Sequence, residues 1–142
     1  MLHTIPPIIP PDLLRDLAAM GHGDRIAIVD RNFPSASRGR RVHHLPGLDA
    51  ATVLRAVLIL LPLDSFVPNP AATMAPVDPS IGVPPAVADL AAVLAEAGHA
   101  APETVERFAF YELTASAFAV IQTGEARPYG NVVLTKGVIF AG

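Results

Sequence analysis

The sequence contains no cysteine among its 142 residues. This absence excludes a disulfide framework, a thiolate zinc site and a cysteine nucleophile. No apolar run approaches the roughly 18 residues that a membrane-spanning helix requires, so we expect no membrane partner. The first residues also lack the basic start and long apolar stretch of a signal peptide. All of this is compatible with a cytoplasmic protein.

Several short catalytic and nucleotide-binding motifs are absent as well. The chain has no HExxH, GxSxG or GxxxxGK[ST], and no GxGxxG that opens a helix. His43 and His44 are adjacent, so on a strand they would point to opposite faces and could not bind one metal ion together. The residues therefore give no sign of a metal, a nucleotide cofactor or an acyl-enzyme.

Charge is scarce, because only 16% of the residues are charged and the formal net charge is −3. A nucleic-acid partner would require a clustered basic face, so we expect none. The one basic cluster comprises Arg38, Arg40 and Arg41. We interpret it as a solvated loop, with an anion or partner contact as the alternative.

The chain is instead rich in apolar residues. They make up 51% of the sequence, and the mean hydropathy is +0.44. A length of 142 residues fits a single domain, residues 1–142, with its own core. One core of this size does not readily absorb so much apolar surface. Because no membrane segment is expected, we predict that subunit interfaces bury the remainder in a homo-oligomer.

Apolar periodicity predicts three longer helices and one short one. The first, over residues 10–20, has a proline entry and should end on Gly21 as a left-handed cap. The second begins at Asp49, a good N-cap, and the third begins at a Pro-Pro pair and stops at Gly98. A short helix is predicted over residues 107–117.

The predicted strands lie between these helices. Residues 26–29 are apolar without polar alternation, which is typical of a strand buried on both faces. Further strands are predicted at 71–75, 117–124, 131–135 and 137–140. The proline-rich segment 62–85 is interpreted as an ordered crossover. Strands that alternate with helices predict an α/β layered domain.

The best acid–base candidate is His22, which stands between two glycines. Histidine exchanges protons near neutral pH, and flanking glycines leave the ring uncovered. The alternative is a helix-terminal histidine favoured by the helix dipole. Asp30 ends the first predicted strand, and open α/β sheets build binding sites at strand ends. The alternative interpretation of Asp30 is a turn residue that ends the strand.

Three sequence blocks resemble the L-fucose mutarotase family, a branch of the larger group that contains D-ribose pyranase. They are "MGHGDRIAIVDRNFP", "RFAFYE" and "TGEARPYGNVVLTKGV", and the resemblance extends from "HTIPPIIPPDLL" through "LDSFVP" to the C-terminal "LTKGV". The resemblance implies an enzyme that interconverts the anomers of a free sugar without a cofactor. The fold that it implies is a compact α/β domain with helices packed around a mainly parallel sheet. It also implies ring-shaped oligomers, often decamers of two stacked pentamers, with sites at subunit interfaces.

By position, the resemblance places the catalytic histidine on His22. It places the sugar-binding residues on Asp30, Arg107, Tyr129, Gly130 and Asn131. His22 would donate a proton to the ring oxygen, while Asp30 would accept hydrogen bonds from sugar hydroxyls or orient His22. Both side chains are thus expected at one sugar. Tyr111 ranks lower, since a tyrosine on a half-buried helix is more often a packing residue.

Three alternatives to a fucose mutarotase stay open at this point. The first is a ribose pyranase-like enzyme that interconverts pyranose and furanose forms. The second is a monosaccharide-binding module without turnover, and the third is a structural assembly protein.

Overall fold

A single six-stranded sheet organises the chain in the computed structural model, which describes residues 1–142. Its strands stand in the order β2-β5-β1-β6-β3-β4. In chain order the strands are β1 (Arg25–Val29), β2 (Val42–Leu45), β3 (Ala71–Met74), β4 (Glu103–Val105), β5 (Ala119–Thr123) and β6 (Val132–Thr135). The helices are α1 (Pro11–Ala19), α2 (Ser35–Arg38), α3 (Ala50–Leu60), the 3-10 turn η1 (Pro79–Ile81), α4 (Pro85–Glu96) and α5 (Arg107–Ala115).

The sheet is mainly parallel, as the sequence predicts. Strand β1 pairs in parallel with β5, β5 with β2, and β3 with β4. Only β6 runs the other way, and it lies between β1 and β3. This arrangement confirms an α/β domain with one mixed sheet.

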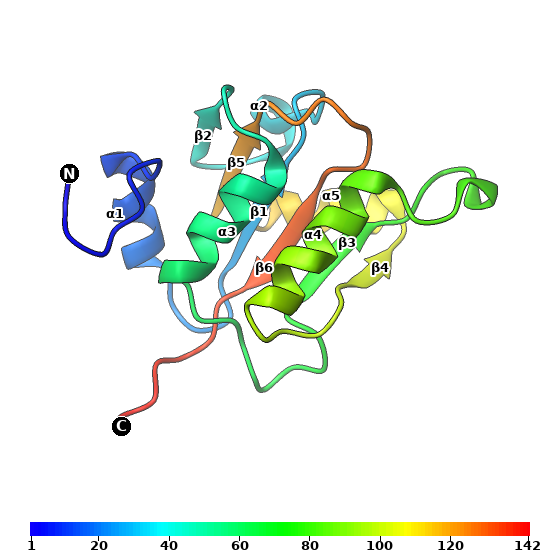
Figure 1. The fold of residues 1–142 in the computed structure, drawn as a ribbon. Coiled ribbons are helices and arrows are strands. Elements are labelled where there is room, and N and C mark those ends of the chain that lie inside the picture. The colour runs from blue at the N-terminus through cyan, green and yellow to red at the C-terminus, as the bar shows by residue number, and fades with distance from the viewer.

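Helices cover both faces of the sheet, with α3 and α4 on one side and α5 on the other (Figure 1). The residues of β1 alternate between the two layers. Ile26 and Ile28 join the larger core cluster under α3 and α4, whereas Ala27 and Val29 pack in the smaller cluster with Phe110 of α5. These four residues have no exposed surface, so the prediction that residues 26–29 form a strand buried on both faces is confirmed.

The helix ends follow the predicted chemistry, with one correction. The Asp49 side chain accepts a hydrogen bond from the Thr52 N–H at 2.8 Å and caps α3. The prediction of a left-handed cap at Gly21 is wrong. Helix α1 ends at Ala19, with Met20 extended as its cap, and the positive φ of 86° falls on Gly23 instead. The left-handed glycine thus shapes the turn into β1 rather than the end of the helix.

The predicted strand at 137–140 is also wrong. That segment has no regular structure, and pairing ends at an isolated bridge between Leu63 and Lys136. Ile139 and Phe140 are 82% and 65% exposed, so these apolar side chains lie on the surface and not in the core. The sequence analysis did not predict α2, β2, β4 or η1, which have at most four residues each. None of the helices combines the length and apolar character needed to cross a membrane.

Candidate active site

His22 and Asp30 lie at opposite ends of strand β1. His22 precedes the strand and Asp30 follows it directly. A strand rises by about 3.3 Å per residue, so the five residues of β1 alone place its two ends roughly 16 Å apart. The two ends of β1 point to opposite edges of the fold in Figure 1. Within one chain the two side chains therefore do not reach the same sugar, contrary to our expectation.

A cavity of about 230 Å³ opens at the Asp30 end of β1. Asp30, Arg107, Tyr129 and Asn131 all line it, so it collects four of the predicted sugar-binding residues. Tyr111 lines it too, although the sequence analysis ranked it lower. The other lining residues are Asn32, Phe33, Pro34, Met74, Val77 and Pro128. Its volume is below the range of about 300–1,000 Å³ typical of drug-sized ligands, which suits a smaller molecule.

The register of β1 and β6 brings the polar residues of this cavity together. The strands are antiparallel, with Ile28 opposite Val132. The residue that follows β1 therefore faces the residues that precede β6. The Asn131 Oδ1 accepts a hydrogen bond of 2.8 Å from the backbone N–H of Asp30. This bond joins two residues that are 101 positions apart in the chain.

Asp30 is a buried carboxyl with only 7% of its surface exposed. Burial raises the pKa of Asp30 above its usual value, and the negative charge of Glu125 adds to the increase. Hydrogen bonds from Asn32, Phe33 and Asn131 oppose that change; the Asn32 N–H donates to Asp30 Oδ1 at 3.0 Å. When ionised, the carboxylate can only accept hydrogen bonds, as sugar hydroxyls require.

Arg107 and Tyr129 supply donors to the same cavity. Arg107 is the first residue of α5 and forms no ion pair; its guanidinium lies 4.7 Å from the ring centroid of Phe108. The Tyr129 hydroxyl accepts a hydrogen bond of 3.0 Å from the Val77 N–H, so its own proton is left to donate. Tyr129 has a φ of 64°, a conformation that is uncommon outside glycine. The loop thus holds this side chain in a specific, strained orientation.

Gly130 shapes the loop without lining the cavity. A Cβ atom at this position would lie 2.6 Å from Glu125 Cγ and 3.4 Å from the Ala86 Cβ. Any side chain would therefore displace Glu125, which is itself buried. Because Gly130 has no side chain, the backbone between Tyr129 and Asn131 can pack directly against Glu125.

His22 forms a separate cluster at the other end of β1. Its Nε2 lies 3.0 Å from Asp64 Oδ1, and its ring centroid is 5.4 Å from that of Phe66. The His22 side chain is 45% exposed, whereas that of Asp64 is only 4% exposed. Within one chain the carboxyl that contacts His22 is therefore that of Asp64, a residue that the sequence analysis did not single out, and not that of Asp30.

Asp64 lies beside His22 because the backbone segment around Leu63 and Asp64 pairs with the end of β6. The Asp64 N–H donates to the Thr135 carbonyl at 3.0 Å, which attaches this segment to the end of β6. Asp64 Oδ1 also accepts a 3.0 Å hydrogen bond from the Phe66 N–H. That N–H lowers the pKa of Asp64, and the hydrogen bond and charge of His22 lower it further. Asp64 is therefore an ionised partner for an imidazole.

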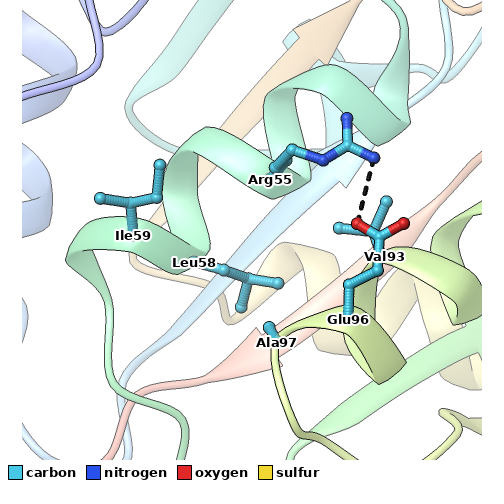
Figure 2. Close-up of a pocket in the computed structure, with 6 residues that line it drawn as sticks. All are labelled: Arg55, Leu58, Ile59, Val93, Glu96 and Ala97. Atoms are coloured by element: carbon cyan, nitrogen blue, oxygen red, sulfur yellow. Dashed lines mark hydrogen bonds and ion pairs between the residues drawn. The ribbon is translucent and has the colours of Figure 1, made fainter.

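A second cavity, of about 240 Å³, lies between α3 and α4 (Figure 2). It is mostly apolar, and its two charged residues, Arg55 and Glu96, pair with each other at 3.4 Å. It offers no free acid or base to a ligand. The structure contains no group of three or more potential ligands that could hold a metal ion.

The fold and the Asp30 cavity together define an α/β protein with a small polar cavity at one edge of a mixed sheet. The chain belongs to the RbsD / FucU transport protein family, whose model matches residues 3–139.

Similar proteins of known name agree with this assignment. A fucose mutarotase of Bos taurus is 43% identical over 145 residues, which cover 98% of this chain and 95% of that protein. The fucose mutarotase of Streptococcus pneumoniae, solved in complex with L-fucose, has a TM-score of 0.91 and 35% identity over 98% of this chain and 100% of its own. RbsD of Bacillus subtilis, solved with D-ribose, has a TM-score of 0.74 and 26% identity over 93% of this chain and 95% of its own.

Proposed function

We infer that the protein is a sugar mutarotase that interconverts the α and β anomers of free L-fucose. The observation that carries this function is the Asp30 cavity, in which a carboxylate, a guanidinium, a phenol and an amide converge. The full-length similarity to fucose mutarotases supports fucose over ribose as the substrate, because the ribose-bound relative is more distant.

Mutarotation needs only two proton transfers. The ring opens when the anomeric hydroxyl loses a proton and the ring oxygen gains one, and closure on the other face of the carbonyl reverses both transfers. General acid–base catalysis typically contributes about 10²–10⁴-fold to a rate. This contribution suffices for a reaction that also proceeds without an enzyme.

Each polar residue has a role that matches its chemistry. His22 donates the proton to the ring oxygen, and Asp64 orients the imidazole and stabilises its charged form. Solvent water takes up the proton of the anomeric hydroxyl and returns one on closure. Asp30 accepts hydrogen bonds from sugar hydroxyls, while Arg107 donates to hydroxyl oxygens. The Asn131 amide can donate and accept. The Tyr129 hydroxyl donates to the sugar, and Gly130 permits the turn that presents it.

We propose that each site takes His22 from one subunit and the Asp30 cavity from its neighbour. Strand β1 separates these groups within a chain, so a second copy must deliver the histidine. His22 is half-exposed and its ring lies at a tilt beside that of Phe66, as a group that reaches across an interface would. A contact between two different ends of the molecule is head-to-tail and can close into a ring.

Exposed apolar side chains at both ends support this contact. Phe66 and Phe140, with centroids 6.2 Å apart, are 68% and 65% exposed near His22. Val77 and Phe108 are exposed beside the Asp30 cavity. Burying such groups against each other would favour assembly. We propose a homodecamer of two stacked pentameric rings, and light scattering would test it.

The activity is tested by saturation-transfer NMR on L-fucose, which reports exchange between the anomers with and without protein. We expect acceleration on L-fucose above that on D-ribose. Faster exchange on ribose would favour the ribose pyranase alternative. A thermal shift with fucose but no acceleration would indicate a binding module.

The shared site is tested by mixing two inactive variants, His22→Ala and Asp30→Asn. If subunits exchange, random pairing in a 1:1 mixture gives a wild-type His22 opposite a wild-type Asp30 at about a quarter of head-to-tail interfaces. We therefore expect about a quarter of the wild-type rate. A site contained within one chain would give none, because every chain carries one defect. Native mass spectrometry of the mixture verifies that the subunits exchange.

A further inference from the structure

His22 lies in a four-residue turn that runs from Gly21 to Asp24. The Asp24 N–H donates to the Gly21 carbonyl at 3.1 Å, which closes the turn along the backbone. His22 and Gly23 are the two central residues, and Gly23 has a φ of 86°. Glycine adopts such a φ without strain, and several turn types require it at the third position. Gly23 thus permits a turn with the imidazole at its tip.

The Asp24 side chain closes the same turn a second time. Its Oδ2 accepts a hydrogen bond of 2.7 Å from the Gly21 N–H. A hydrogen bond to a carboxylate is roughly twice as strong as one between neutral groups. The glycine on each side of His22 would otherwise leave the backbone unusually free, because glycine has no Cβ to restrict it. Asp24 therefore restrains a segment that its glycines make flexible.

The backbone of Asp24 is fixed by the sheet. Its carbonyl accepts a hydrogen bond of 2.8 Å from the Lys136 N–H, and the Lys136 carbonyl accepts one of 2.9 Å from the Gly23 N–H. These bonds extend the antiparallel pairing of β1 with β6 beyond the ends of both strands. The Asp24 carboxylate therefore projects from a fixed backbone position, and the turn that it closes is positioned relative to the sheet.

Two segments on either side of the β6 end bring His22 and Asp64 together. The His22 turn pairs with Lys136 from one side, and Leu63 pairs with Lys136 from the other. The two side chains meet at 3.0 Å between His22 Nε2 and Asp64 Oδ1. A Cβ atom on Gly137 would lie 2.8 Å from the Asp64 Cα, so the backbones pack closely there. Asp64 thus has little room to follow a displaced imidazole.

We propose that Asp24 is a positioning residue that holds His22 against Asp64 by closing the turn. This proposal rests on the proposed function for its effect on the rate, but its structural part concerns the sugar-free protein. Asp24 does not line the Asp30 cavity, so it acts through His22 and not on the sugar. Without its carboxylate the turn samples other conformations, and the imidazole spends less time at Asp64 Oδ1. A displacement of about 1 Å at a reacting group can cost roughly 10²-fold in rate.

The test compares Asp24→Ala with Asp24→Asn. Alanine removes the acceptor for the Gly21 N–H, whereas the side-chain oxygen of asparagine retains it. We expect Asp24→Ala to lower kcat for anomer exchange of L-fucose about tenfold, because the proton donor is misplaced part of the time. KM should stay nearly unchanged, since the Asp30 cavity is intact. Asp24→Asn should retain most of the wild-type kcat. Saturation-transfer NMR over a range of fucose concentrations measures both parameters.

A second measurement follows His22 in the sugar-free protein. Its ring centroid lies 5.4 Å from that of Phe66, so nuclear Overhauser effects should join protons of the two rings. Labelling of histidine and phenylalanine, with assignment by His22→Gln, isolates these signals. We expect them in wild type and in Asp24→Asn, and we expect them to weaken or vanish in Asp24→Ala. A residue that contributed only to stability would not change them.

Asp49→Ala is the matched control. The Asp49 side chain also accepts a backbone hydrogen bond, from the Thr52 N–H at 2.8 Å, but it does so at the start of α3. The variant therefore removes a bond of the same kind outside the His22 turn. It should leave kcat and the Overhauser effects as in wild type. Circular dichroism and native mass spectrometry verify that every variant is folded and assembled as wild type is.

Three results would overturn the proposal. The first is a folded Asp24→Ala that keeps the wild-type kcat, and the second is a loss of kcat with unchanged Overhauser effects. The third is an Asp24→Asn that loses as much as Asp24→Ala, because the shared hydrogen bond would then not be the cause. If the Overhauser effects change as expected but wild type does not accelerate exchange on fucose, the positioning of His22 stands and the proposed function fails.

Discussion

The imidazole Nε2 of His22 lies 3.0 Å from Oδ1 of Asp64, a carboxylate 42 residues further along the chain. This contact leaves Nδ1 as the ring nitrogen that can exchange a proton with a sugar. It also fixes the ring, because Asp64 is itself held by the Phe66 N–H. A carboxylate that orients a histidine and stabilises its charged form is a recurrent arrangement for acid–base catalysis.

Replacing Asp64 with asparagine should lower kcat while leaving KM nearly unchanged. The amide oxygen can still accept from the Phe66 N–H, so the loop is retained, but the charge that stabilises an imidazolium is lost. We expect about a tenfold loss, smaller than the loss of about 10²–10⁴-fold expected for His22→Ala. Anomer-exchange NMR over a range of fucose concentrations separates the two parameters. The control is Ser65→Ala, because Ser65 is the exposed neighbour of Asp64. A raised KM with unchanged kcat in Asp64→Asn would contradict the role of Asp64 in stabilising the charged imidazole.

Replacing Asp30 with asparagine should stabilise the fold and abolish sugar binding. Burial raises the pKa of Asp30, so the ionised carboxylate costs stability at neutral pH. Removing the charge should therefore raise Tm at neutral pH. The gain should fade as the pH falls through the raised pKa of Asp30 toward its ordinary value of 3.8, because wild type then loses the same charge.

Thermal denaturation at neutral pH and near pH 4, with and without fucose, measures both effects. Wild type should gain stability from fucose, and Asp30→Asn should not. A lower Tm for the variant at neutral pH would mean that the hydrogen bonds to Asp30 outweigh its burial.

The elements that the sequence predicted well are those whose signal is local. Helix α3 was predicted from the apolar residues along one of its faces and from its Asp49 cap. Strand β1 was predicted from its unbroken run of apolar residues. The edge strand β4, "ETV", has two exposed residues and no apolar run, so its local sequence does not predict a strand. The apolar "GVIF" segment gave the opposite error, because exposed apolar residues near a proposed interface resemble a core strand.

The site was predictable only in part for the same reason. A resemblance along the chain identifies residue types, but it does not show which of them come together in the fold. The Asp30 cavity gathers residues through the long-range register of β1 with β6, and Asp64 reaches His22 through the bridge between Leu63 and Lys136. Such pairings depend on tertiary structure, so the contact between Asp64 and His22 was not visible in the sequence. The separation of His22 from Asp30 was, because the predicted strand 26–29 already lay between them.

Replacing Tyr129 with phenylalanine should weaken fucose binding more than it slows turnover. The hydroxyl accepts the Val77 N–H at 3.0 Å and has a proton left for the sugar. Its loss removes a hydrogen bond worth about 0.5–1.5 kcal/mol, so we expect KM to rise by about two- to tenfold. Fucose titration by calorimetry measures the affinity directly. The control is Tyr111→Phe, because Tyr111 lines the same cavity and its hydroxyl forms no hydrogen bond within the protein. An equal loss of fucose affinity in both variants would contradict a specific role for Tyr129.

Replacing Gly130 with alanine should damage the sugar site while sparing most of the fold. The new Cβ would lie 2.6 Å from Glu125 Cγ, closer than such atoms approach, and Arg127 holds Glu125 in place through two hydrogen bonds. The loop must therefore shift by several tenths of an ångström, and that shift moves Tyr129 and Asn131 relative to Asp30. We expect a loss of fucose affinity of tenfold or more, because small displacements of positioning groups are costly.

Gly47→Ala is the matched control for this substitution, since a Cβ there meets no atom within 4 Å and the backbone needs no positive φ. It should bind fucose as wild type does. If Gly130→Ala retains wild-type affinity, Glu125 can move aside without disturbing the cavity. Combining Gly130→Ala with Glu125→Ala separates these cases: removal of the Glu125 side chain relieves the clash, so affinity should recover partly if the contact with Glu125 is the cause of the loss.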